Sequence, residues 1–165
     1  VEDILNRAKA NNEAPFVIIA DEICDPHNLG AIIRSANAVG AHGVIISKNR
    51  SAGVTPVVFK TSAGAAAYTP VARVGNLTQT MNKLKENGLW ITGADMAGDR
   101  EMCEADLTGP LALVIGSEGK GITKKIRDNC DFFVQIPMVG EINSLNASVA
   151  AAVLMYEALR QRRAK

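Results

Sequence analysis

Short apolar runs rich in β-branched residues alternate along this chain with segments of helical periodicity, and this alternation limits the folds open to it. The runs that predict strands are FVIIADE (16–22), GVIISK (43–48), TPVARV (69–74), LWITGAD (89–95), LALVIG (111–116) and FFVQIP (132–137). Helical spacing predicts helices over 1–12, 28–40, 55–64, 76–88, 121–130 and 146–164. Strands joined by helices favour an α/β fold, a mostly parallel sheet flanked by helices.

The composition agrees with one domain of 165 residues. Hydrophobic residues make up 47% of the chain but aromatic residues only 4%, so Val, Ile, Leu and Ala fill the core, as they do around buried parallel strands. No secretory signal opens the chain, and no apolar run approaches the ~20 residues that span a membrane. We therefore expect a cytoplasmic protein without a membrane partner.

The cysteine spacing and the net charge exclude few classes of function. Cys24, Cys103 and Cys130 have no CxxC spacing, so neither a disulfide framework nor a zinc site is indicated, and we expect no metal. The net charge of +1 favours neither nucleic acid nor membrane. Two basic clusters are most simply interpreted as solvated helix faces. The first consists of Lys120, Lys124, Lys125 and Arg127, and the second of Arg160, Arg162, Arg163 and Lys165.

The first polar motif is DPHNLGAIIRSANAVG, which follows the first predicted strand. Pro26 stops extension of the strand, and Asn28 is predicted to cap the helix. Arg34 lies about 240° around the helix from Asn28, beside Ile33 on an otherwise apolar helix. Spacing alone favours an amphipathic Arg at the edge of the buried face over a site residue.

The second motif is IGSEGKGI, a glycine-rich turn between a strand and a helix. It fails the phosphate-loop spacing, because only Ser117 and Glu118 separate Gly116 from Gly119-Lys120. Glu118 would also repel a phosphate. One interpretation is a tight turn with Glu118 at a helix N-terminus; the other is a loop whose backbone approaches a ligand.

The third motif, NSLNAS, precedes the last helix. A helix N-terminus needs one capping side chain, yet Asn143, Ser144, Asn146 and Ser148 gather here. The helix that follows, ASVAAAVLMY, is apolar on all sides and is therefore expected to be buried. All three motifs fall at carboxyl ends of predicted strands, where open α/β sheets bind their ligands.

Together and in this order, the three motifs resemble those of the SpoU (TrmH-type) branch of the SPOUT RNA methyltransferases. The stretch RSAGVTPVVFKTSAGAAAYTPVARV resembles the catalytic domain of the bacterial 23S rRNA guanosine-2′-O-methyltransferases. That subgroup is expected to carry an acidic residue near Ala67–Tyr68, which this chain lacks.

The resemblance implies a fold and an activity. Residues 15–165 would form the S-adenosylmethionine-dependent domain, with a deep trefoil knot at its C-terminal end. Residues 1–14 would be an N-terminal helix or linker, and the upstream RNA-binding domain of the subgroup is expected to be absent. The implied enzyme is a homodimer with each site completed across the interface. It would transfer a methyl group to a ribose 2′-hydroxyl of RNA, most simply a guanosine of 23S rRNA.

The resemblance also implies roles for individual residues. The catalytic residues would be Asn28, Arg34, Glu118, Ser144 and Asn146. Those holding the cofactor would be Gly93, Ala94, Asp95, Gly116, Glu118, Gly119, Ile136, Met138, Ser144, Leu145 and Ala147. RNA would contact Arg34, Lys48, Arg50, Lys60 and Lys120. Because a guanidinium stays protonated, we expect Arg34 to stabilise the developing alkoxide and not to act as a base.

Other functions remain open. A tRNA 2′-O-methyltransferase of the same family and a non-catalytic RNA-binding module on the same fold are the nearest alternatives. A nucleotide-phosphate-binding protein is disfavoured by the loop spacing. A purely structural dimerisation domain would leave the glycine and Ser/Asn clusters unexplained.

Overall fold

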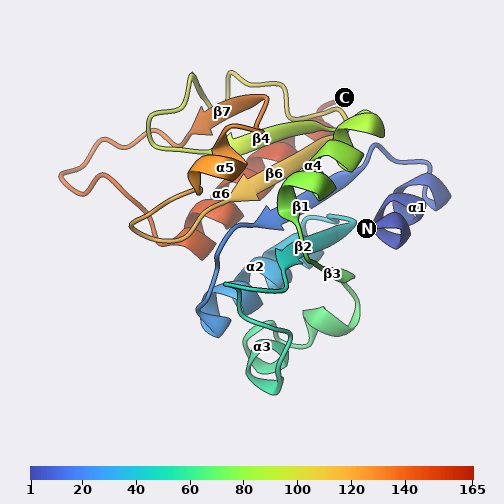
Figure 1. The fold of residues 1–165 in the computed structure, drawn as a ribbon. Coiled ribbons are helices and arrows are strands. Elements are labelled where there is room, and N and C mark those ends of the chain that lie inside the picture. The colour runs from blue at the N-terminus through green and yellow to red at the C-terminus, as the bar shows by residue number, and fades with distance from the viewer.

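The computed structural model describes residues 1–165 as one seven-stranded sheet with helices on both faces (Figure 1). The strands are β1 (Phe16–Ala20), β2 (Gly43–Ser47), β3 (Val71–Val74), β4 (Trp90–Ala94), β5 (Arg100–Glu101), β6 (Leu111–Ile115) and β7 (Phe132–Gln135). The helices are α1 (Glu2–Ala10), α2 (Pro26–Ala38), α3 (Pro56–Thr61), α4 (Leu77–Glu86), α5 (Lys124–Arg127) and α6 (Ala147–Arg163), with a 3-10 turn η1 (Ala65–Ala67).

Every strand pair is parallel, in the order β3-β2-β1-β6-β4-β7-β5. The prediction of an α/β fold with a mostly parallel sheet flanked by helices is confirmed. The two-residue strand β5 lies in a stretch for which the sequence predicted no regular structure, because so short a run has no periodicity to detect.

The fully buried strand β1 divides the core into two. Phe16, Ile18 and Ala20 pack into the cluster that also holds the buried faces of α2 and α6. Val17 and Ile19 pack on the opposite face, with side chains of α1 and α4. Side chains alternate across a strand, so a run of five apolar residues can supply both cores at once.

The N-terminus of α2 differs from the prediction. Asn28 was expected to cap this helix, but the helix begins two residues earlier, at Pro26. Asp25 is the N-cap, and its carboxylate accepts a hydrogen bond from the His27 amide at 2.9 Å. Proline suits the first helical position, which needs no amide donor. The side chain of Asn28 is consequently free for another partner.

The helix predicted over 121–130 is a single turn, Lys124–Arg127. Gly119 and Gly121 adopt left-handed backbone angles, with φ of 78° and 66°, and Thr123 is extended. These conformations keep the chain in a loop until Thr123. By contrast, the short helix predicted after Thr55 is confirmed, with the Thr55 hydroxyl accepting from the Val58 amide.

The last helix, α6, is amphipathic in its environment although not in its sequence. One face packs on α2 and buries Leu154 and Met155. The other face leaves Val149 47% and Tyr156 52% exposed. The single chain therefore buries only one face of this helix, and burial of the other face stays a prediction. None of the helices has both the length and the apolar character needed to cross a membrane.

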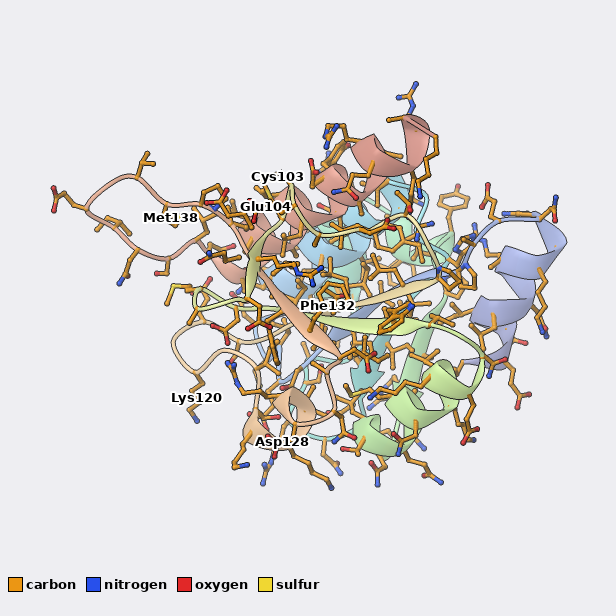
Figure 2. The ribbon with its side chains drawn as sticks, turned by 90° about the horizontal axis from the view of Figure 1, so that it is seen from above. Cys103, Glu104, Lys120, Asp128, Phe132 and Met138 are labelled. Carbon is orange, nitrogen blue, oxygen red and sulfur yellow. The ribbon has the colours of Figure 1, made fainter.

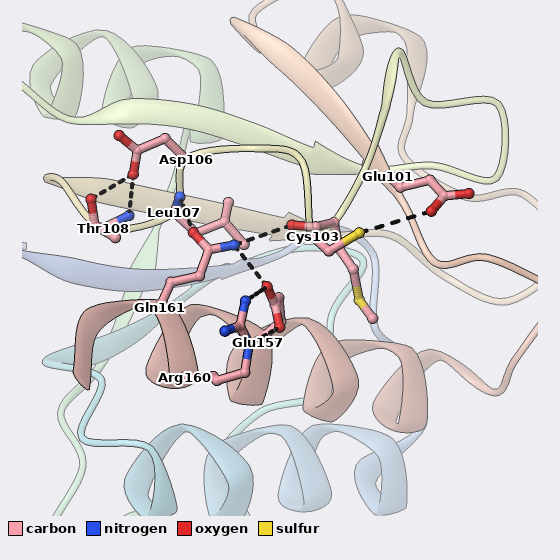
Figure 3. Close-up of polar contacts among 9 residues, drawn as sticks. Glu101, Cys103, Asp106, Leu107, Thr108, Glu157, Arg160 and Gln161 are labelled. Carbon is pink, nitrogen blue, oxygen red and sulfur yellow. Dashed lines mark hydrogen bonds and ion pairs between the residues drawn. The ribbon is translucent and has the colours of Figure 1, made fainter. Parts of the chain in front are cut away.

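The C-terminal half of α6 fastens the segment between β5 and β6 (Figure 3). Gln161 accepts a hydrogen bond from the Leu107 amide at 2.9 Å and donates to the Met102 carbonyl at 3.3 Å. Arg162 donates to the carbonyls of Ala14, Leu107 and Gly109, and it lies over the ring of Phe16. A solvated basic face is therefore the wrong interpretation for Arg162.

Candidate functional site

A cavity of about 710 Å³ opens at the carboxyl ends of β4, β6 and β7. These strands are neighbours in the sheet, so the loops that follow them meet at one edge. The loop from β7 to α6 projects beyond that edge (Figure 1), and Figure 2 shows Met138 on this loop and Lys120 on the neighbouring one. The second and third polar motifs of the sequence line this cavity, whereas the first motif, after β1, does not.

The cavity gathers most of the residues expected to hold a cofactor. Gly93 is the exception. It lies inside β4, where an added Cβ would come within 2.6 Å of the Phe133 ring, so its small size serves packing. The expected residues that do line the cavity are Ala94, Asp95, Gly116, Glu118, Gly119, Ile136, Met138, Ser144, Leu145 and Ala147.

Asn146 joins the three sequence motifs at one point. Its Oδ1 caps α6 by accepting from the amides of Ser148 and Val149 at 3.0 and 3.2 Å. Its Nδ2 donates to Oδ1 of Asn28 at 3.1 Å and to the carboxylate of Glu118. Glu118 also accepts from the Ala147 amide at 3.1 Å. The polar cluster therefore does more than cap a helix, because it ties α2 and the glycine-rich loop to α6.

The glycine-rich loop is folded tightly back on itself. Ser117 and Gly121 form an isolated antiparallel bridge. An added Cβ on Gly116 would lie only 2.2 Å from the carbonyl carbon of Gly121, so no larger residue fits there. Both interpretations of this motif hold in part: the turn is tight, and its residues also line the cavity.

Asp21, at the end of β1, anchors the far end of this loop. Its Oδ2 accepts from the amide and the hydroxyl of Thr123 at 2.7 and 2.8 Å. Burial raises the pKa of Asp21, the two bonds from Thr123 oppose that rise, and the nearby carboxylate of Glu22 adds to it. This buried acid thus holds the loop 102 residues away in sequence.

Arg127 is a cavity residue that the sequence analysis missed. It was grouped with a solvated basic cluster, but its guanidinium pairs with the carboxylate of Asp95 and lies 5.0 Å from the centre of the Phe133 ring. These two partners come from the residue that follows β4 and from β7, so no local spacing could have indicated the role. The carboxylate of Asp95 therefore lies in the cavity paired with a guanidinium.

Arg34 lies apart from the residues it was grouped with. It is exposed on α2, its side chain forms no hydrogen bond or ion pair, and it does not line the cavity. Of the expected RNA contacts, Lys120 lines the cavity, whereas Lys48, Arg50 and Lys60 are exposed elsewhere. No group of three or more His, Cys, Asp or Glu side chains is placed to hold a metal ion.

Comparison with known proteins agrees with this geometry. The TrmH family tRNA/rRNA methyltransferase YacO of Bacillus subtilis is 50% identical over 98% of this chain. The 23S rRNA (guanosine-2′-O-)-methyltransferase RlmB of Pseudomonas putida is 45% identical over the whole chain. This chain spans 65% of the length of each relative.

A solved structure extends the comparison to the fold. The SpoU methyltransferase AviRb from Streptomyces viridochromogenes, solved with AdoMet, is 36% identical and superposes with a TM-score of 0.87. The match covers 93% of this chain and 62% of AviRb. The SpoU rRNA Methylase family profile matches residues 15–156, a range that includes the motif residues Asn28, Glu118 and Asn146. The chain therefore belongs to the SpoU rRNA methylase family.

Proposed function

We propose that this chain transfers a methyl group from S-adenosylmethionine to a ribose 2′-hydroxyl of RNA, with a guanosine of 23S rRNA as its target. The observation that carries the proposal is the cavity at the carboxyl ends of β4, β6 and β7, whose lining residues Glu118 and Asn146 are joined by a hydrogen bond, with Asn28 bonded to Asn146 from outside the cavity. The names of the RlmB relative and of the AdoMet-bound AviRb structure support the substrate and the cofactor.

The cavity residues fit this cofactor. Its volume lies within the range of small-molecule sites, about 300–1,000 Å³. Ile115, Ile136 and Leu145 offer apolar walls suited to an adenine ring. The carboxylates of Asp95 and Glu118 offer acceptors for ribose hydroxyls or an ammonium, and their negative charge suits the positive sulfonium. The backbone of the glycine-rich loop lies open at Gly119 for close approach.

The chemistry divides between cofactor and protein. S-adenosylmethionine, when bound, supplies an activated methyl group. Asn146 and Glu118 hold the loops that shape the cavity, and Ser144 presents a hydroxyl at its wall. Alignment of the 2′-oxygen by such fixed groups supplies several kcal/mol of rate enhancement.

Arg34 requires a second copy of the chain for its proposed role. We assign it to stabilising the developing alkoxide, yet it is exposed and outside the cavity of its own chain. A homodimer would bring Arg34 of one protomer to the cavity of the other. The exposed apolar side chains of Val139, Ile142, Val149 and Tyr156, on the cavity loop and α6, suit such an interface.

The chain is further proposed to form a deep trefoil knot around the cavity. Knotted chains are very rare, so this proposal rests on family membership and not on strand order. The knot would be formed by the loops that follow β6 and β7. It would hold the cofactor loops closed without a disulfide, which suits three cysteines that are all free.

The first test is calorimetric titration of the chain with S-adenosylmethionine, with ATP as the control. Saturable binding of the methyl donor alone is expected. Transfer of radiolabelled methyl groups to a 23S rRNA fragment or to a tRNA transcript then separates the rRNA enzyme from a tRNA enzyme, which the name of the YacO relative also allows. Cofactor binding without transfer to either RNA would favour the non-catalytic module.

A further inference from the structure

A second, smaller cavity of about 330 Å³ lies at the carboxyl ends of β1, β2 and β3. It shares the edge of the sheet with the proposed cofactor cavity, and β1 and β6 are neighbours, so the two openings lie side by side along that edge. Nine of its twelve lining residues carry polar side chains. Nothing in the proposed methyl-transfer chemistry accounts for it.

The wall of this cavity contains a carboxylate oxygen that accepts no hydrogen bond within the chain. Asp21 is only 2% exposed, and both hydrogen bonds from Thr123 go to its Oδ2. No hydrogen bond in the protein reaches Oδ1. Glu22 lines the cavity next to it, with its side chain 22% exposed. Burial raises the pKa of Asp21, the two bonds from Thr123 to Oδ2 lower it, and the charge of Glu22 raises it further.

The mouth of the cavity has the opposite charge. Arg50, whose side chain is 82% exposed, and the exposed Lys125 both line it. Arg50 also donates to Oε1 of Glu22 at 3.4 Å, which leaves Oε2 of Glu22 and the other guanidinium N–H groups for a ligand. The first turn of α4 contributes Leu77 and Thr78, whose amides have no acceptor within the chain. The depth of the cavity therefore accepts hydrogen bonds, whereas its mouth donates them and attracts anions.

This polarity selects among ligands. A free phosphate would be repelled by Asp21 and Glu22, and no group of three metal-ligating side chains is present for a cation. A nucleotide matches, with N–H groups on its base and an anionic phosphate. Among the bases, guanine alone presents two adjacent donors, N1–H and the N2 amino group, to a carboxylate, while O6 accepts from an amide. Bases in unpaired RNA are recognised at this edge.

We propose that the second cavity binds an unpaired guanine of the RNA substrate, with the carboxylates of Asp21 and Glu22 receiving its N–H donors and Arg50 and Lys125 facing its phosphate. The inference rests on the proposed function, since it assigns part of the RNA that the enzyme would read. It goes further because it names a base and a site outside the cofactor cavity.

The test is an NMR titration of the backbone amides of the whole chain with GMP, IMP, AMP, CMP and UMP. Saturable shifts are expected with GMP at lining residues such as Thr78 and Lys125. IMP, which lacks the N2 amino group, should bind about tenfold more weakly. Equal binding of all five nucleotides would overturn the proposal in favour of a phosphate site, and the absence of saturable shifts at the lining residues would also overturn it.

Asp21→Asn is the informative variant. Its amide oxygen can still accept from Thr123, while Nδ2 replaces the acceptor that faced the cavity, so GMP should bind about tenfold or more weakly. The matched control is Asp106→Asn, because Asp106 accepts from the amide and hydroxyl of Thr108 in the same way at an exposed site. If Asp21→Asn does not fold, Glu22→Gln replaces it and should also weaken GMP binding.

An unchanged GMP affinity in the folded Asp21 or Glu22 variant would overturn the assignment. Titrating the same wild-type sample with S-adenosylmethionine separates the two proposals. Cofactor binding without GMP binding rejects only the guanine site. The lack of cofactor binding rejects the proposed function instead.

Discussion

The side-chain amide of Asn146 donates to the side-chain oxygen of Asn28 at 3.1 Å, across 118 residues of sequence. The same Asn146 caps α6 through its other side-chain atom, so helix initiation and site assembly share one residue. These two tasks use different atoms and can therefore be separated by substitution.

Asn146→Asp should preserve the N-cap of α6 and disrupt the cofactor site. Aspartate caps a helix as well as asparagine does, so we expect a change in unfolding free energy of less than about 1 kcal/mol. The new carboxylate would face Glu118 where an amide donor was, and cofactor binding should weaken severely. Asn146→Ala should cost about 1 kcal/mol or more of stability as well. Urea denaturation and cofactor titration of both variants check this, and normal cofactor affinity in the Asp variant would contradict it.

Arg127→Lys tests whether charge alone holds Asp95 in the cavity. Lysine can pair with the carboxylate but does not stack on Phe133 as a planar guanidinium does. We expect cofactor affinity to fall several-fold in Arg127→Lys and further in Arg127→Met. A double-mutant cycle with Asp95→Asn should give a coupling of about 1 kcal/mol, because Arg127 is partly exposed. Additive losses would show that the pair does not act as a unit.

Asp21 should make the protein less stable as the pH rises. Its pKa in the folded state is raised above the ordinary 3.8, so the folded state binds more protons than the unfolded state above pH 3.8. Its contribution to stability is complete below pH 3.8 and is lost as the pH rises through the folded-state pKa. Relative to wild type, Asp21→Asn should therefore gain stability toward neutral pH. Urea denaturation midpoints of the wild type and the variant across this pH range check this prediction. A gain in stability of Asp21→Asn at acidic pH alone would refute it.

The three cysteines should differ in reactivity. Burial raises the pKa of Cys130 to about 12, so its thiol stays protonated at mildly alkaline pH, where the thiolate is the reactive form. Cys24 and Cys103 are exposed. Brief treatment with iodoacetamide should alkylate these two and spare Cys130, as read by peptide mass spectrometry. In urea all three should react; rapid labelling of Cys130 in the native protein would count against its burial.

Local sequence patterns predicted the features that depend on neighbouring residues, namely most of the strands and some of the helix caps. The β-branched runs gave the strands, and the rule that ligands bind at carboxyl ends of strands gave the place of the cavity. Asn146 was found because its neighbours were more polar than a cap requires. Thr55 was found because capping is a local interaction.

Contacts across the sheet could not be read from the sequence. Arg127 meets Asp95 only after β4 and β7 have paired, and Asp21 meets Thr123 only beside β6. The start of α2 was misplaced because both Asp25 and Asn28 are good caps and their surroundings decide between them. The position of Arg34 relative to a site stays a prediction, since α2 exposes it in the single chain.

The strand order has a consequence for synthesis of the protein on the ribosome. The strands β1, β2 and β3 can pair as soon as they have emerged, but β4 has no partner among them. Only β6 lies between β1 and β4 and joins the two halves of the sheet. The nascent chain therefore carries β4 unpaired while at least the next 17 residues are translated, from 95 to the start of β6 at Leu111. During that interval, translation speed and chaperones decide how well the exposed strand is protected.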